Sequence, residues 1–510
     1  MEQNLRLVLA IFDTLNRRSL ECYGGTSLKT PNFNRLSQNT ITFDNHYAGS
    51  LPCMPARREL MTGRYNFLHR SWGPLEPFDN ALPEILFEDA GVYSHLVTDH
   101  SHYWKDGGAT YHSRFDSYEF VRGQEMDPWK GLVRPPFEEW EQRYHPSQVD
   151  RTPRSKYRRN LVNREYIKKY SDLPSVQTMS LGIEFIETNK NEDNWFLQIE
   201  TFDPHEPFDV PVDFKAGYPT NYSGPILDYP PYGKFSGSSD EIEELKAKYA
   251  KCLEHCDEQL GRLLDIFDQH NLWKDTALIL TTDHGFLLGE HELWAKNVMP
   301  VYDEVAKIPF FMHAPGFDKF KGQRRKYHTQ TIDLMPTILE IFKIEKPIEC
   351  QGNQLLKILK ADEKNNRFLI YGHHGAAINI TNGQYTYFLY PENLNDGNLF
   401  QYTLMPMHIL SMFSTEELKL AKLHEPFNFT KEVPLLKIPV IESSAFYKRH
   451  GPGSLIQTNT MLFDLTVDPD QKSPITNLEI ETMLKKEIKK LMIESDAPKE
   501  LFKRFSLEEI

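Results

Sequence analysis

Four short apolar runs along the chain have the length and composition of buried β-strands. They cover residues 5–12, 195–201, 276–282 and 308–313. Apolar runs of about four to eight residues are typical of strands that helices cover on both faces. The pattern therefore predicts a central sheet, mostly parallel and buried inside the protein.

An amphipathic helix is predicted over about residues 240–268, between the second and third of these runs. Its apolar side chains recur at steps of three and four, as one face of an α-helix requires. Ser238, with Glu241 three residues later, forms a capping-box pattern that marks the start of the helix. Helices that alternate with buried strands indicate a layered α/β domain with a mixed central sheet flanked by helices.

The pattern of predicted strands and helices changes from about residue 366 onward. The first part of this region has the pattern of short strands joined by a hairpin turn at Asn382-Gly383. The segment 461–471 follows, and then a charged helix from about residue 477. We therefore predict two domains, a large α/β domain and a smaller α+β domain with a short antiparallel sheet, over residues 1–365 and 366–510.

Two long polar segments rich in proline and tyrosine, residues 130–175 and 209–240, are predicted as surface loops. Long loops of this kind often shape substrate pockets. The stretch before the first of them contains Arg122, Glu125 and Asp127. These side chains either reach a sugar or stabilise their loop, and both interpretations stay open at this point.

Carboxylates and imidazoles follow three of the predicted strands. Asp13 comes after the first run, Asp203 and His205 after the second, and Asp283 with His284 after the third. In open α/β sheets, ligand sites form beyond the carboxyl ends of the strands. The pattern therefore indicates one site built from distant parts of the sequence.

The composition is ordinary for a globular protein, with 40% hydrophobic and 25% charged residues in a chain of 510. A formal net charge of −14 argues against nucleic acid and anionic membranes as partners. No run approaches the about 18 apolar residues of a membrane-spanning helix. The N-terminal residues lack the basic start and cleavage site of a signal peptide, so we expect a cytoplasmic protein.

Five cysteines, an odd number in a long chain, argue against a disulfide framework. Cys252 and Cys256 lie four residues apart on the predicted helix, with His255 between them. One interpretation is a metal site. We favour the other, in which the two cysteines are small apolar side chains on a buried helix face.

Cys53 stands in a segment that does not resemble a buried strand, LPCMPARRELMTGR. The thiol lies between two prolines, and two adjacent arginines and a Thr-Gly pair follow it. The segment resembles the Cys-x-Pro-x-Arg…Thr-Gly motif of the sulfatases, which belong to the alkaline phosphatase superfamily. Further blocks along nearly the whole chain also resemble family segments, and they imply the alkaline-phosphatase-like fold: AIFDTLNRRSLECYGG, TPNFNRLSQNTITFDNHYAGS, TTDHGFLLGEHELWAK, TIDLMPTILEI and MLFDLTVDPDQ.

The resemblance implies a nucleophile that the gene does not encode, a formylglycine made from Cys53 by a maturation enzyme. A divalent cation, first calcium and second manganese, would concentrate positive charge at the sulfate. Arg57 would stabilise the hydrated aldehyde. By family position, the metal ligands are Asp13, Cys53, Asp283 and His284, the further catalytic residues are His102, His205 and Lys296, and the substrate-binding residues are His100, His205 and Lys296.

The implied reaction is the hydrolysis of a sulfate ester, with a sulfated sugar as the expected substrate. One hydroxyl of the hydrated aldehyde attacks sulfur, and His205 or Lys296 protonates the departing alcohol. His102 then takes a proton from the second hydroxyl, so that the aldehyde forms again and sulfate leaves. The expected partners are a small-molecule or oligosaccharide sulfate ester and the maturation enzyme.

Two alternatives stay open. Thr14 follows Asp13 where many sulfatases have a second aspartate, and His284 replaces the asparagine of some relatives. Both features recur in phosphonate monoester and phosphodiester hydrolases on the same scaffold, which are the first alternative. The second is a non-catalytic binding relative in which Cys53 stays unmodified.

Overall fold

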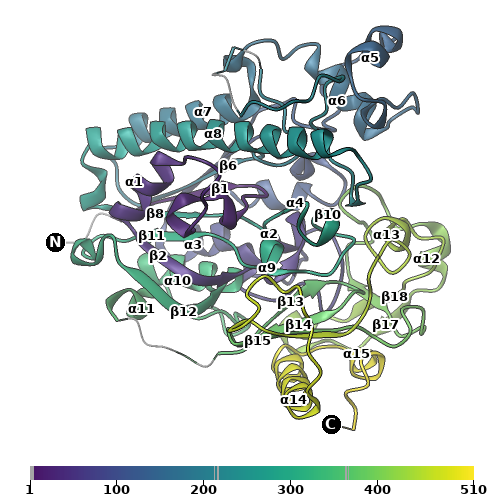
Figure 1. The fold of residues 1–510 in the computed structure, drawn as a ribbon. Coiled ribbons are helices and arrows are strands. Elements are labelled where there is room, and N and C mark those ends of the chain that lie inside the picture. Colours follow the sequence, from purple (N-terminus) through teal and green to yellow (C-terminus); the bar gives the residue numbers. More distant parts are fainter. Residues whose placement is uncertain (1–4, 212, 215–217, 362–364, 366, 510) are drawn as a thin grey trace.

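A computed structural model describes residues 5–211, 213–214, 218–361, 365 and 367–509. The centre of the protein is an eight-stranded sheet (Figure 1). All neighbouring strands run parallel except β11, which is antiparallel to both of its neighbours. The mostly parallel, mixed sheet is therefore confirmed. Its spatial order is β12 (Arg324–Gln330), β2 (Ile41–Tyr47), β11 (Phe310–His313), β8 (Thr276–Thr281), β1 (Arg6–Phe12), β6 (Trp195–Thr201), β4 (Tyr93–Thr98) and β5 (Ser117–Phe120).

The four apolar runs of the sequence form the middle of this sheet, where β11, β8, β1 and β6 lie side by side. Every residue of β1, β6 and β8 is buried, because helices cover both faces. Strand β11 begins at Phe310 rather than at residue 308 as predicted. Pro309 has no amide N–H to donate to a sheet ladder, which explains the later start.

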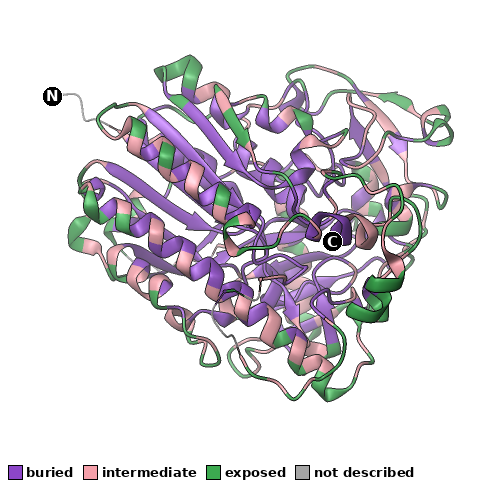
Figure 2. Cartoon of the chain, turned by 90° about the horizontal axis from the view of Figure 1, so that it is seen from above, coloured by how far each residue is buried: buried purple, intermediate pink, exposed green. Residues whose placement is uncertain are grey.

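Helices cover the two faces of the sheet, and in Figure 1 α7 and α8 lie above it and α10 and α11 below it. One face carries α1 (Pro31–Asn39), α7 (Pro174–Asn189) and α8 (Ser239–Gln269). The other carries α2 (Cys53–Thr62), α3 (Leu82–Ala90), α10 (Leu334–Ile341) and α11 (Leu356–Lys360). Figure 2 shows the consequence: the strands in the middle of the sheet are buried, and the exposed residues lie in the loops and on the outer sides of the helices.

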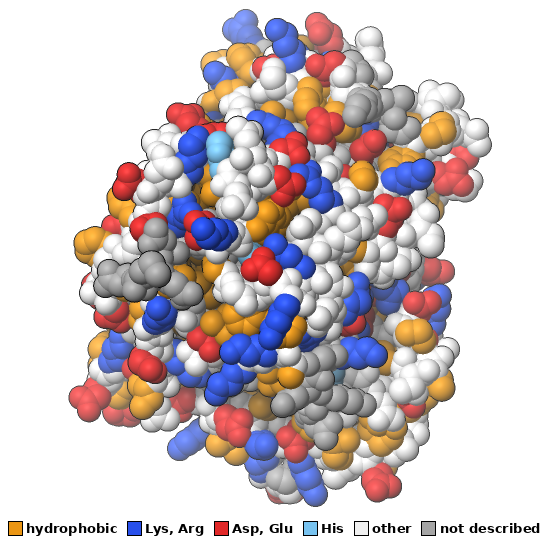
Figure 3. Space-filling model, turned by 90° about the vertical axis from the view of Figure 1, so that its left-hand side faces the viewer, with side chains coloured by type: hydrophobic (Ala, Val, Ile, Leu, Met, Phe, Trp, Pro, Cys, Tyr) orange, Lys and Arg blue, Asp and Glu red, His pale blue; other side chains and the backbone are white. Residues whose placement is uncertain are grey.

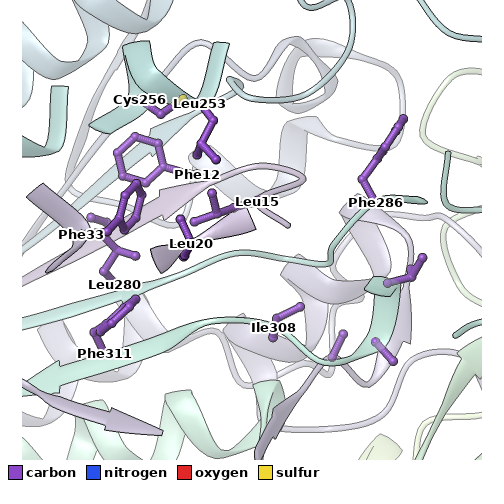
Figure 4. Close-up of a cluster of buried hydrophobic side chains, with 14 of the residues drawn as sticks. Phe12, Leu15, Leu20, Phe33, Leu253, Cys256, Leu280, Phe286, Ile308 and Phe311 are labelled. Atoms are coloured by element: carbon purple, nitrogen blue, oxygen red, sulfur yellow. The ribbon is translucent and has the colours of Figure 1, made fainter. Parts of the chain in front are cut away.

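Side chains from distant segments meet in the core between the sheet and its helices (Figure 4). Phe12 and Phe33 pack edge to face with ring centroids 6.0 Å apart, and Leu253 and Cys256 of α8 belong to the same cluster. His255 contacts the hydroxyls of Tyr170 and Ser175 through its two ring nitrogens. Within the described part of the chain, the group that could hold a metal ion includes neither cysteine of α8. This agrees with the apolar interpretation of these cysteines.

The capping box at the start of α8 is confirmed. The Ser238 hydroxyl accepts a hydrogen bond from the Glu241 amide at 3.3 Å, and the Glu241 carboxylate accepts one from the Ser238 amide at 2.6 Å. Together they satisfy two amides that have no partner inside the helix.

Replacing Ser238 with alanine should therefore loosen the first turn of α8. The expected cost is about 0.5–2 kcal/mol, which corresponds to roughly 2- to 30-fold faster amide exchange in that turn. Hydrogen exchange read by mass spectrometry measures it. Ser239→Ala is the control, because Ser239 is exposed and is not the capping residue. Equal exchange in the two variants would contradict the capping role.

The C-terminal region contains a second sheet of five strands, antiparallel except where β13 pairs with β3. Asn382 and Gly383 lie in the turn between β14 and β15, as predicted. Residue 366, the first of the predicted second domain, lies outside the described residues. The sheet and the helices beside it are β19 (Met461–Asp464), β15 (Tyr385–Leu389), β14 (Ile378–Thr381), β13 (Leu369–His373), β3 (Ser50–Leu51), α14 (Leu478–Glu494) and α15 (Lys499–Arg504).

Strand β3 has a special position, because it precedes Cys53 by one residue and comes from the N-terminal part of the chain. Its pairing with β13 attaches the C-terminal sheet to the segment of the expected nucleophile. A small sheet that the sequence analysis did not predict also lies in this region, formed by β16 (Phe400–Thr403), β18 (Leu435–Pro439) and β17 (Lys422–His424).

The prediction that residues 130–175 form a loop is wrong in part, since the segment contains α5 (Phe137–Arg143) and α6 (Lys156–Arg164). The two helices share a small core of their own around Trp140, Tyr144 and Leu161. Each has fewer than three turns, which is too short for the spacing of apolar residues to reveal. The other predicted loop, 209–240, contains only the short strand β7 (Gly233–Lys234) among its described residues before α8 begins.

Among the described residues, four more short helices are α4 (Ala109–His112), α9 (Asp303–Ala306), α12 (Thr415–Lys419) and α13 (Ala445–Arg449). Among the described residues, no helix combines the length and the apolar composition that crossing a bilayer requires. On the face shown in Figure 3, basic and acidic side chains are interspersed, and no single charge dominates it.

Candidate active site

Cys53 is the first residue of α2, and its side chain is 2% exposed. The Sγ atom lies 3.2 Å from Nε2 of His284. Burial, and then the negative charge of Asp13, raise the pKa of this thiol well above its usual range. Helix α2 ends at Gly63, whose left-handed backbone suits glycine. The unusual segment of the sequence is thus a helix that begins at the thiol.

The strand ends that carry Asp13, Asp283 and His284 converge on this thiol. Asp13 follows β1, and Asp283 and His284 lie just beyond β8, the parallel neighbour of β1. One ligand atom from each of these three residues and Sγ of Cys53 all lie within 4.8 Å of one another. The structure therefore brings together the four residues that the family resemblance named as metal ligands.

Arg57 lies one turn after Cys53 in α2 and joins three carboxylates. Its two terminal nitrogens donate to Asp13 and Asp283 at 2.7 Å each, and Nε donates to Glu200 at 2.6 Å. All four side chains are at most 5% exposed. Burial alone would raise the pKa of the Asp13 carboxyl, but the nearby Arg57 guanidinium and His100 hold it well below its usual range.

Glu200 was missed by the sequence analysis. It is the sixth residue of β6, a strand otherwise formed mostly by apolar residues, and Tyr103 also donates to it at 2.8 Å. A fully buried glutamate inside a strand is costly unless it is paired. An acidic residue within an apolar run was the feature of the sequence that could have indicated a paired, buried carboxylate.

Lys296 approaches the same group from the other side, directly after β10 (Leu293–Ala295). Its ammonium donates to the Thr14 hydroxyl at 2.8 Å and lies 3.5 Å from the Glu206 carboxylate. Burial lowers the pKa of a lysine, but Glu206 and the other acidic groups nearby raise that of Lys296 above its usual value. Lys296 is therefore a cation held inside the site, and Thr14 occupies the place of the missing second aspartate as its acceptor.

The buried charges of the site do not balance. Burial lowers the pKa of the imidazoles of His100, His102 and His284 below the usual value, which leaves them neutral near pH 7. Buried charges require partners. Four carboxylates face two cations: Asp13, Glu200, Glu206 and Asp283 against Arg57 and Lys296. The deficit of positive charge is therefore two, which a divalent cation would supply.

The remaining predicted histidines differ in what they face. His100 is fully buried, and its Nε2 lies 3.2 Å from the Asp13 carboxylate. His102 packs edge to face on Trp72 with centroids 5.4 Å apart, and its Nδ1 is buried with no hydrogen-bond partner among the described residues. Nδ1 of His205 contacts the Glu206 carbonyl at 2.5 Å, which leaves Nε2 as its other polar atom.

A cavity of about 400 Å³ opens above Cys53. His102, His205 and Lys296 line it, but His100 and Arg57 do not. Glu125 also lines it, whereas Arg122 and Gly123 both bond to Asp127 and so stabilise their own loop. The other lining residues are Pro52, Trp72, Met126, Arg154, Ser155, Lys156, Tyr232, Asn297, Leu410, Arg449 and His450.

Comparison with known proteins identifies the family. The sulfatase family model matches residues 6–344, and a model of the N-sulphoglucosamine sulphohydrolase C-terminal region matches residues 289–418. A multifunctional alkaline phosphatase superfamily protein of Trinickia caryophylli is 27% identical over 65% of this chain and 71% of its own length. An arylsulfatase of Clostridium perfringens is 22% identical over 81% of this chain and 91% of its own.

The fold has close counterparts among solved structures. The phosphonate monoester hydrolase of Agrobacterium radiobacter superposes with a TM-score of 0.62 and 17% identity, over 96% of this chain and 95% of the other. This likeness shows the alkaline-phosphatase-like fold. The family model covers more than half of the chain, so the protein belongs to the sulfatase family, the hydrolases of sulfuric esters.

Proposed function

We propose that the protein hydrolyses the sulfate ester of a sugar, with a formylglycine made from Cys53 as nucleophile and one divalent cation as cofactor. The observation that carries the proposal is the cluster of Asp13, Cys53, Asp283 and His284, of which Cys53 lines a cavity. The match to the N-sulphoglucosamine sulphohydrolase C-terminal region supports a sugar as the alcohol part.

Asp13, residue 53, Asp283 and His284 would hold the cation. When bound, it supplies the positive charge that polarises the sulfate ester and lowers the pKa of a hydroxyl at residue 53. Two carboxylates favour a hard ion, so calcium is the first candidate, and the neutral imidazole of His284 admits manganese as the second. Restoring activity of chelator-treated protein with each ion in turn distinguishes them.

The proton transfers would fall to residues that line the cavity. His102 presents a neutral imidazole with an unbonded Nδ1, which is suited to accept a proton from residue 53. Lys296 and Nε2 of His205 are suited to donate to the departing alcohol oxygen. His100 was expected to bind substrate, but it faces Asp13 and not the cavity, so we propose that it positions Asp13 instead.

Glu200 should act as a positioning residue for Arg57. In Glu200→Gln a neutral amide replaces the partner of Nε, and kcat should fall by roughly 10- to 100-fold with KM nearly unchanged. Because Glu200 lies outside the group of metal ligands, this variant should lose less bound metal than Asp283→Ala. Steady-state kinetics and elemental analysis measure these quantities. Glu119→Gln, on the exposed edge strand β5, is the control and should keep full activity. A Glu200→Gln enzyme with normal kcat would contradict the positioning role.

A second candidate, phosphonate monoester hydrolysis, is favoured by Thr14 and His284, the two departures from the common sulfatase pattern. Turnover of an aryl sulfate and of phenyl phosphonate by the matured protein decides between them. We expect the larger kcat/KM for the sulfate. A larger value for the phosphonate would overturn the proposed reaction and leave the fold and the cation site in place.

A further inference from the structure

Three cationic side chains line the cavity away from the metal-ligand cluster. Arg154 precedes α6, Lys156 is its first residue, and Arg449 is the last residue of α13 (Ala445–Arg449). Within the described part of the chain, none of the three forms an ion pair or a hydrogen bond through its side chain. Glu125 is the one acidic residue among the described lining residues.

A solvated arginine on a surface needs no partner, but Lys156 is in a different position. Its ammonium lies over the rings of Tyr229, Tyr232 and Tyr157, at 4.4, 4.8 and 5.1 Å from their centroids. Burial lowers the pKa of this ammonium, and the charges of Glu125 and Glu206 only oppose that effect. The rings cover part of this half-buried side chain, and among the described residues no carboxylate forms an ion pair with its ammonium.

Another part of the lining is apolar. Trp72 and His450 stack with ring centroids 4.9 Å apart and an angle of 17° between their planes. Leu410 and Met126 extend this surface. Such surfaces suit a sugar ring, and about 400 Å³ leaves room for more than a sulfate group. The cavity therefore offers an apolar surface, a reacting end at residue 53 and separate cations.

We infer that the alcohol part of the substrate carries a second anionic group, which Lys156, Arg449 and Arg154 bind while the reacting sulfate lies against residue 53. The inference rests on the proposed function and adds a substrate class to it. A carboxylate of a uronic acid and a second sulfate would satisfy the same cations. The reacting sulfate does not need them, because Lys296 and the proposed divalent cation would already supply positive charge at residue 53.

Binding measurements on calcium-loaded Cys53→Ala protein test this without catalysis. The ligands are monosulfated pyranosides, the same sugars with a second sulfate, and their disaccharides with glucuronic acid. We expect the second anion to tighten binding by about 10- to 100-fold, as charged hydrogen bonds do. The better of the two charged series identifies the anion. Equal affinity for the monosulfated sugars and for both series with a second anion would overturn the inference.

Lys156→Met tests the residue itself, because methionine keeps an apolar stem among the tyrosines. It should remove most of the gain from the second anion, and Arg449→Gln, an exposed position, should remove part of it. Lys448→Gln is the control, since Lys448 is exposed on the same helix but does not line the cavity. An undiminished gain in both Lys156→Met and Arg449→Gln would also overturn the inference.

The proposed reaction and the proposed substrate class can be contradicted separately. If matured wild-type protein hydrolyses an aryl sulfate but Cys53→Ala binds the monosulfated sugars as tightly as those with a second anion, the substrate class is wrong and the reaction stands. If it hydrolyses no sulfate ester, yet Cys53→Ala still prefers the charged series through Lys156, the anion site stands and the proposed reaction is wrong.

Discussion

Replacing Cys53 with alanine should abolish turnover, lowering kcat by at least about 10⁴-fold, as loss of a nucleophile does. In the proposed reaction, a hydroxyl oxygen of residue 53 is the nucleophile that forms the bond to sulfur. Neighbouring groups cannot substitute for it, because His102, His205 and Lys296 are placed to move protons. Steady-state kinetics with an aryl sulfate measures the loss.

The same substitution should leave the melting temperature nearly unchanged. Cys53 lines the cavity, so removing its sulfur enlarges an existing space instead of creating a void in the core. Cys22→Ala, a partly buried cysteine outside the cavity, is the control for cysteine loss and should keep full activity. Substantial turnover by Cys53→Ala would contradict the nucleophile assignment, whatever its stability.

The second large effect is expected at Asp283, where alanine should remove the bound cation. Asp283 supplies one of the four clustered ligand groups, and even an outer partner of a metal ligand typically contributes about 10- to 100-fold in affinity. Loss of a direct ligand should therefore weaken binding by at least about 100-fold. Elemental analysis of desalted protein measures the occupancy.

The charge of the site adds to this expectation. Without Asp283, one carboxylate fewer faces Arg57 and Lys296, and the deficit of positive charge that favours a divalent ion falls by half. Asp275→Ala is the control, because Asp275 lies just before the start of β8, at the opposite end of the strand from Asp283. Full metal occupancy in Asp283→Ala would exclude this carboxylate as a ligand.

The convergence of Asp13, Asp283 and His284 could be predicted from the sequence because it follows from a general rule. Each residue stands at the end of an apolar run, and parallel neighbours bring their carboxyl ends to one edge of a sheet. Cys53 was predictable for another reason, since Pro55, Arg57 and the Thr-Gly pair make a motif with short, fixed spacing. Local patterns and strand ends thus determined the centre of the site.

Contacts between distant segments could not be predicted in this way. Glu200 looks like one polar residue in an apolar strand until Arg57 is placed against it. Thr14 gains a role only because Lys296 reaches it from 282 positions away. Lys156 lies in a segment predicted as a loop, and two of its three tyrosine neighbours, Tyr229 and Tyr232, belong to another such segment. No periodicity links these residues, so only the folded chain shows them together.

The mass of the tryptic peptide that ends at Arg57 decides whether residue 53 is a formylglycine, measured on protein co-expressed with a formylglycine-generating enzyme. The account predicts that the sulfur of residue 53 has been replaced by an aldehyde oxygen, in proportion to activity. Full turnover by a protein whose residue 53 keeps an unmodified thiol would contradict it. An unmodified thiol together with no turnover would instead support the non-catalytic relative.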